Sequence, residues 1–156
     1  MEFKREEYSE GLVAEIWPLL EEHYQEIAHF QDIPLAPDFE AYRNAEKLGV
    51  VRIFTARDQG RLDGYAIYFL RRNIHYQTSL QAVQDILFLS AGLRRGLAGY
   101  RFIKWCDEQL KKENVQVVYQ HVKLAHNFGP VLERIGYEPV EVTYVRRLDP
   151  WDSQQL

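Results

Sequence analysis

The residues best suited to chemistry form one continuous stretch of the sequence, residues 85–100. Its first part, Asp85–Leu89, is apolar after the aspartate and is typical of a strand, and a basic turn, Gly92–Gly96, then precedes a helix. Backbone N–H groups in the first turn of a helix lack internal partners and attract anions. Arg94 and Arg95 add positive charge and directional donors. The stretch therefore predicts a phosphate site, and the alternative is an ordinary tight turn with solvent-facing arginines.

Two common phosphate motifs do not fit this stretch. No Gly-Lys-Ser/Thr follows the turn, which excludes a Walker loop. Gly92 and Gly96 do not have the spacing of a dinucleotide fingerprint, and the strand before them lies in the middle of the expected sheet.

The stretch resembles the acetyl-CoA-binding motif of the GNAT N-acetyltransferase superfamily, Arg/Gln-x-x-Gly-x-Gly/Ala. Arg94 takes the first position and Gly99 the last. Leu97 departs from the motif, because it stands where the middle glycine is usual, and Gly96 comes one place earlier. The family's preceding strand carries an acidic residue nine positions before the arginine, which is Asp85 here.

The resemblance extends over residues 80–148 and is compatible with residues 1–79. In the family, the motif is followed by a strand, a short helix and a Gly-Phe/Tyr step; the counterparts here are Val115–Val122, Asn127–Ile135 and Gly136-Tyr137. The segment Asn73–Tyr76 is similar to GNAT-like proteins encoded by tailed bacteriophages.

This resemblance implies a mixed, mostly antiparallel α/β sheet (α+β type) whose central parallel strands splay apart, with helices on both faces. Acetyl-CoA, the implied co-substrate, would lie in the V-shaped gap, with its pyrophosphate on the turn and its pantetheine paired like an added strand. The amine would enter from the side of the acidic N-terminal helices. The implied cofactor-binding residues are Leu87, Phe88, Leu89, Arg94, Arg95, Gly96, Leu97, Ala98, Gly99, Tyr100 and Asn127.

An amine acceptor must lose a proton before it attacks, because a lysine-like amine with a pKa of ~10.4 is almost entirely charged at neutral pH. Asp85 is the first candidate base, directly or through water, since burial in an apolar strand would tune it for proton transfer. The alternative is a carboxylate at the exposed end of the strand or paired with an arginine. His121 is the second candidate, and His75 and His126 are further alternatives.

The general acid is less clearly indicated. The family often uses a tyrosine four residues before the Gly-Phe/Tyr step to protonate the leaving thiolate, and Leu132 occupies that position. Tyr119 and Tyr144, expected on neighbouring strands, are the candidate substitutes. Cys106 is expected in a helix core, so we predict direct attack in a ternary complex rather than a covalent acyl-enzyme.

The elements that must position these residues follow from hydrophobic periodicity. They are expected in the order ααβββαβαβ. Two helices are expected at 10–27 and 38–48, and Pro18 should kink or split the first. Three strands are expected at 50–57, 62–72 and 81–89, followed by a helix that ends at 111–112. A strand at 115–122, a helix at 127–135 and a last strand at 140–148 complete the order. Ser9 and Asp38 are predicted N-caps.

Composition bounds the class of protein. The chain has 156 residues, 46% hydrophobic and 27% charged, which predicts one domain over residues 1–148 and a tail over 149–156. The net charge of -4 argues against a nucleic-acid partner. The first 50 residues carry 12 acidic and 4 basic side chains, which suits a cationic amine.

Further expectations concern location and partners. No apolar run is long enough to span a membrane, no leader pattern begins the chain, and one cysteine excludes an internal disulfide, so we predict a cytoplasmic protein, in the host cytoplasm if it is phage-encoded. No His/Asp/Glu spacing predicts a metal. The acceptor is a small molecule or a protein lysine, and a homodimer is possible. The alternative function is a GNAT-fold CoA-binding or assembly module with little or no catalysis.

Overall fold

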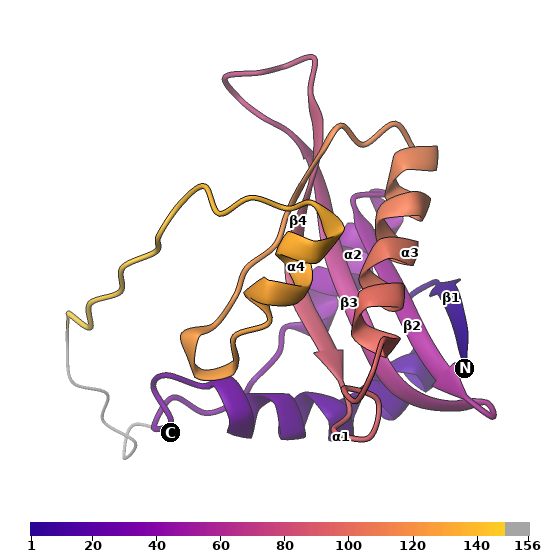
Figure 1. Ribbon diagram of the computed structural model, residues 1–156. Coiled ribbons are helices and arrows are strands. Elements are labelled where there is room, and N and C mark those ends of the chain that lie inside the picture. Colours follow the sequence, from indigo (N-terminus) through magenta and orange to yellow (C-terminus); the bar gives the residue numbers. More distant parts are fainter. Residues whose placement is uncertain (149–156) are drawn as a thin grey trace.

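The sheet contains its strands in the same order as the chain (Figure 1). The computed structural model describes residues 1–148. Within that part the strands are β1 (Glu2–Glu6), β2 (Val51–Asp58), β3 (Arg61–Arg72), β4 (Leu80–Leu89) and β5 (Val117–Tyr119). The first three pairings are antiparallel and β4 pairs with β5 in parallel. The expected mixed, mostly antiparallel sheet is confirmed.

Two of the helices in the described chain, the first two, begin at a side-chain cap. They are α1 (Glu10–Ile27), α2 (Phe39–Lys47), α3 (Ala98–Lys112) and α4 (Gly129–Ile135), with a short 3-10 turn, η1 (Leu124–His126). Both predicted caps are confirmed, since Ser9 Oγ accepts from the Leu12 amide at 3.1 Å and Asp38 Oδ1 accepts from the Ala41 amide at 2.9 Å. The predicted split at Pro18 is wrong, because α1 runs on through it. Of the helices in residues 1–148, none has the length and hydropathy to cross a bilayer.

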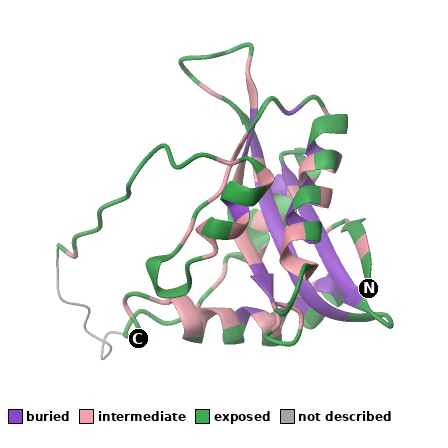
Figure 2. Cartoon of the chain, in the orientation of Figure 1, coloured by how far each residue is buried: buried purple, intermediate pink, exposed green. Residues whose placement is uncertain are grey.

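Two hydrophobic cores lie on the two faces of the sheet, so helices cover both faces as expected. On one face, α3 packs Phe102, Cys106 and Leu110 against the strands. On the other face, α1 packs Leu12 and Ile16, together with the rest of its apolar stripe. The buried residues of β2, β3 and β4 form the centre of the molecule in Figure 2. This centre is the rigid support for the end of β4.

The sequence analysis missed β1. Its residues are mostly charged, and only Phe3 packs into the core, against Phe102 and Trp105. An edge strand of this kind has no apolar alternation. It is defined instead by long-range contacts, such as the ion pair of Glu6 with Arg57 at 2.7 Å.

The predicted last strand, Val140–Leu148, is wrong. The segment is extended and lies away from the sheet, with its apolar side chains exposed (Figures 1 and 2). Alternation gives a chain the capacity to pair, but pairing also requires that the segment lie beside the edge of the sheet, and this segment does not. The predicted strand Val115–Val122 is also too long, since only Val117–Tyr119 pairs with β4. The predicted tail, residues 149–156, lies outside the described residues.

Candidate active site

The strands β4 and β5 form a fork. They pair in parallel only from Gln81 with Val117 to Val83 with Tyr119, although β4 continues to Leu89. At the point of divergence the Gln84 side chain spans the two strands, and its Oε1 accepts from the His121 amide at 2.6 Å. Beyond this link the edge of β4 that faces β5 has no strand partner in the described chain. The V-shaped gap implied by the family resemblance is therefore present.

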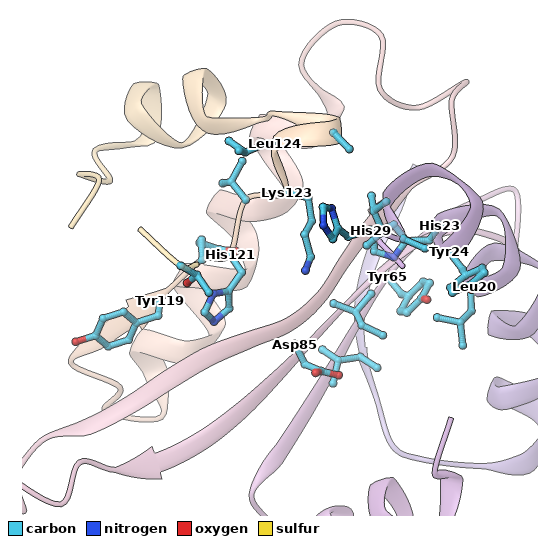
Figure 3. A pocket seen from close by; sticks show the side chains of 18 of the residues that line it. Leu20, His23, Tyr24, His29, Tyr65, Asp85, Tyr119, His121, Lys123 and Leu124 are labelled. Carbon is cyan, nitrogen blue, oxygen red and sulfur yellow. The ribbon is translucent and has the colours of Figure 1, made fainter. Parts of the chain in front are cut away.

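A register irregularity in β4 lies at the start of this open edge. On the neighbouring strand, Ile67 pairs with Ile86 and Tyr68 pairs with Gln84, so Asp85 is an extra residue without a partner in β3. A bulge of this kind bends a strand and redirects a side chain. Here it accompanies the divergence of β4 from β5 and places the Asp85 carboxylate in the cavity beside the fork (Figure 3).

Two tyrosines lie close to Asp85. The Tyr42 hydroxyl, from α2, donates a hydrogen bond to Asp85 Oδ2. Burial, followed by this bond, raises the pKa of Tyr42, so its hydroxyl keeps its proton. The Tyr65 side chain, from β3, is 0% exposed, and its hydroxyl has no hydrogen-bond partner among the described residues. The Asp85 residue is exposed, so its expected burial is wrong.

The helix α3 begins without a cap. Leu97 occupies the N-cap position with no side-chain hydrogen bond, and the first turn contains no acidic residue. Gly96 has a φ of 79°, a left-handed conformation that favours glycine. Leu97 itself is 57% exposed, so this side chain does not fill the core. The start of α3 thus offers free amides and a positive dipole end, as the sequence predicted.

Arg94 does not face solvent, as the alternative of an ordinary tight turn had it, and bonds within the protein instead. Its Nε donates to the Leu89 carbonyl at 2.6 Å, and its Nη2 donates to Glu26 Oε1 at 2.9 Å. Its guanidinium also lies 5.0 Å from the centroid of the Phe88 ring. Arg94 therefore connects the turn to α1, whereas Arg95 is exposed. Whether either side chain contacts a phosphate stays a prediction.

A cavity of about 1490 Å³ adjoins the fork and brings together part of the predicted site. Asp85, Tyr119, His121 and Asn127 line it. In Figure 3, Tyr119 and His121 lie on one side and the α1 residues on the other. The remaining predicted cofactor residues, those of Leu87–Leu89 and of the turn up to Tyr100, are not among its lining residues.

Several of those predicted residues serve the core. Phe88 and Leu89 are buried, and Leu87 packs against the core under α3. The side chains of Phe88 and Leu89 therefore lie in the core, whereas the predicted pairing with a cofactor concerns the backbone. Asn127 Oδ1 accepts from the amide of Gly129, the first residue of α4, at 2.8 Å, while Phe128 occupies the N-cap position.

The acidic wall expected from the N-terminal helices is not where it was predicted. The helix α1 presents its apolar stripe to the cavity together with His23 and Tyr24, and its glutamates are not lining residues. The carboxylates that do line the cavity come from β4 and from the chain after residue 132; they are Asp85, Glu133, Glu138 and Glu141. An amphipathic helix buries its apolar face and turns its charges outward, which accounts for the difference.

The sequence analysis also missed His23. This residue lines the cavity and packs against Phe88, with ring centroids 5.1 Å apart. Burial lowers the pKa of His23 to about 4, against a smaller opposite effect of Glu26, so the ring is neutral at neutral pH. The sequence did contain a signal for this residue, because His23 continues the helical spacing of the apolar residues Leu12, Ile16 and Leu20 on α1. His75 is not among the lining residues of either described cavity, whereas His121 lines both.

Cys106 lies in the core, as expected, and Leu132, at the family's tyrosine position, is buried too. Burial in the α3 core raises the pKa of the Cys106 thiol. Tyr144 lies on the extended segment after α4 and is exposed, away from the fork. The expectation that it sits on a strand is therefore wrong.

The sequence matches no family model and no curated protein. The structure is similar to solved acetyltransferases along nearly its whole length. One is an aminoglycoside acetyltransferase from an uncultured soil metagenomic sample, solved with sisomicin, with a TM-score of 0.71 and 12% identity over 97% of this chain and 96% of that chain. Another is a ribosomal-protein-alanine N-acetyltransferase from Brucella melitensis biovar Abortus 2308, with a TM-score of 0.70 and 15% identity over 95% of this chain and 100% of that chain.

A third is a predicted acetyltransferase from Clostridium acetobutylicum, solved with acetyl-CoA, with a TM-score of 0.68 and 9% identity over 94% of this chain and 97% of that chain. At these identities the likeness establishes the fold. The chain thus has the GNAT-type acetyltransferase fold, as the resemblance implied.

Proposed function

We propose that this protein is an acetyl-CoA-dependent N-acetyltransferase that acts on a primary amine. The observation that carries the proposal is the fork between β4 and β5 beside the uncapped start of α3. This pairing of features offers an open strand edge for an amide-bearing chain and free amides for a diphosphate. The acetyltransferases of the same fold, one of them solved with acetyl-CoA, support this reading.

The reaction we propose is direct attack in a ternary complex. The neutral amine forms the new N–C bond at the thioester carbonyl, the C–S bond breaks, and the thiolate leaves. A free thiol has a pKa of ~8.5, so its thiolate leaves tolerably without a strong acid. The likeness to phage-encoded proteins and the cytoplasmic location stay predictions.

Asp85 is the proposed base in this reaction. The bulge directs its carboxylate into the cavity, and the Tyr42 hydroxyl holds one oxygen in place. The other oxygen is free to accept the proton of the amine, directly or through water. Exposed His121 is the further candidate proton acceptor on the same cavity, whereas the lowered pKa of His23 disfavours that role for its ring.

The proposed cofactor site is tested by calorimetry with acetyl-CoA. In Ala98→Glu a carboxylate joins the first turn of α3, where it should repel a diphosphate and leave the helix intact. We expect affinity to fall at least 10-fold. The matched control is Lys104→Gln, which makes the same change in net charge at an exposed position further along α3 and should bind normally. Equal affinity in the two variants would contradict the site.

A separate assay tests catalysis. In Asp85→Asn we expect turnover to fall by about 10²- to 10⁴-fold while acetyl-CoA affinity stays unchanged. Buried Leu132, at the family's tyrosine position, favours the alternative of a CoA-binding module with little catalysis. That alternative predicts normal acetyl-CoA binding and no turnover of any primary amine by the unmodified protein.

A further inference from the structure

The charges inside the main cavity select for a cation. Its lining contains the four carboxylates of Asp85, Glu133, Glu138 and Glu141, and a single lysine, Lys123. No arginine is among the described residues that line it. Lys123 points into the cavity toward the strand that carries Asp85 (Figure 3). The balance of charge is negative, which favours a positively charged ligand over an anion or a neutral one.

Most of the cavity wall is apolar. The helix α1 contributes a stripe that includes Leu12, Ile16 and Leu20, and the loop Ile33–Pro37 adds a second apolar surface. The Tyr24 hydroxyl holds that loop, because it donates to the carbonyls of Gln31, at 3.2 Å, and Ile33. A ligand covered with hydroxyl groups would find few hydrogen-bond partners on this wall and would lose its hydration.

Three residues that line the cavity have a buried polar atom without a partner in the described chain, namely the hydroxyls of Tyr8 and Tyr65 and Oε1 of Gln120, and of these the Tyr65 hydroxyl is the one influenced by Asp85. The Tyr65 hydroxyl is fully buried, lines the cavity and has no partner among residues 1–148. A buried orphan hydroxyl is rare and points to a missing partner. Burial is the larger cause that raises the pKa of Tyr65, and the negative charge of Asp85 raises it further. Tyr65 therefore lies close enough to Asp85 to feel its charge. An ammonium group has three donors, enough for both the carboxylate and the hydroxyl.

We propose that the acceptor is a primary amine on an apolar body, bound as its ammonium by Asp85 and Tyr65 with the body against α1. The acetylation of this amine rests on the proposed function, whereas its binding does not require acetyl-CoA. Asp85 then serves twice, first as the counter-ion of the ammonium and afterwards as the acceptor of its proton. Tyr65 is a specificity-determining residue that contacts the amine and takes no proton.

The experiment is calorimetry on the full chain without acetyl-CoA, with three probe molecules. The first, 2-phenylethylamine, has the charge and the apolar body. The second, 2-phenylethanol, has the same body without the charge, and the third, glucosamine, has the amine on a hydroxyl-covered body. We expect 2-phenylethylamine to bind at least 10-fold more tightly than either of the others.

Two variants assign the contacts. In Asp85→Asn the affinity for 2-phenylethylamine should fall at least 10-fold, and in Tyr65→Phe it should fall about 3- to 10-fold. Since Tyr65→Phe removes only an unpartnered hydroxyl, it should fold with an equal or higher Tm. The matched controls are Asp58→Asn and Tyr76→Phe, at exposed positions outside the cavity, and both should bind normally.

Three results would overturn the proposal: tighter or equal binding of glucosamine, equal binding of the alcohol and the amine, or unchanged affinity in folded Asp85 and Tyr65 variants. Absence of amine binding by a protein that binds acetyl-CoA would also overturn it and would leave the cofactor site standing. Amine binding by a protein that fails to bind acetyl-CoA would support this site and contradict the proposed function.

Discussion

Asp107 is a carboxylate whose ionisation the fold opposes. It lies on α3, where burial raises its pKa to about 6, while the hydrogen bond from the Tyr137 hydroxyl, at 2.6 Å, opposes that shift. The folded protein therefore holds this proton more tightly than the unfolded chain does. Stability that depends on the proton is present below pH 4 and is lost as the pH rises to about 6.

We predict that Asp107→Asn removes this pH dependence. The amide keeps an acceptor for Tyr137 and carries no charge to bury. The free energy of unfolding of the variant should exceed that of the parent by on the order of 1 kcal/mol above pH 7, after allowing for solvent screening, and should match it near pH 4. Urea denaturation at several pH values measures the difference. Glu22→Gln, at an exposed position on α1, is the control and should follow the parent throughout.

At the same scale, the sequence could indicate Asp85 as a candidate base but could not indicate the residues that contact it. Its place before an apolar strand and a basic turn was visible in the sequence. Tyr42 is 43 residues away on another element, and no spacing rule joins them. The bulge was equally hidden, because the apolar pattern of β4 predicts a regular strand. The expected burial of Asp85 failed for this reason.

Among the elements, the junction of β3 with the end of β4 is the most tightly constrained. Gly64 pairs with Leu89, and a Cβ at Gly64 would lie 2.3 Å from Leu89 Cδ2 and 2.9 Å from the Phe88 carbonyl oxygen. We predict that Gly64→Ala displaces the end of β4 and lowers the free energy of unfolding by about 1–3 kcal/mol. Urea denaturation measures the loss, and calorimetry with acetyl-CoA shows whether the displaced turn still binds.

The control for this substitution is Gly92→Ala in the turn that follows β4. A Cβ there meets nothing within 4 Å, and the backbone does not require glycine. This variant should keep the stability of the parent. Equal stability of the two alanine variants would mean that the strands adjust freely at this junction, contrary to the prediction.

Elements with local signals were predictable from the sequence. The caps at Ser9 and Asp38 and the left-handed Gly136 after α4 are all present. Elements defined by a distant partner were not. The strand β1 depends on β2, and the alternation in Val140–Leu148 has no edge beside it in the described chain. The shortness of β5 follows from the fork, which depends on the geometry of β4.

At the scale of the molecule, the segment after α4 runs outward from the body of the protein (Figure 1). Near its described end, Arg147 donates to Asp32 Oδ2 at 2.6 Å and lies over the ring of Phe30. Between α4 and this contact the segment has no strand partner, and Tyr144 is 92% exposed.

We predict that chymotrypsin cleaves first after Tyr144, because a protease needs an extended, accessible backbone. In Asp32→Asn the cleavage should be several-fold faster, since the far end of the segment loses its ion pair. Mass spectrometry of the early fragments measures both effects. Asp58→Asn, which alters a carboxylate at the end of β2, should be cut at the parent's rate. First cleavage within the sheet would contradict the prediction.

The order of the strands has a consequence for how the chain is made. Since the sheet repeats the order of the sequence, each strand leaving the ribosome joins an outer edge, and none must be inserted between two that are already paired. Four strands and their two flanking helices are complete at residue 89. Within this antiparallel base, β2, β3 and β4 pair through short connections, which are the contacts that form fastest, whereas β1 joins β2 across the two helices. The cavity beside the fork, which is lined by residues from the first helix and from the segment after α4, is the part that synthesis completes last.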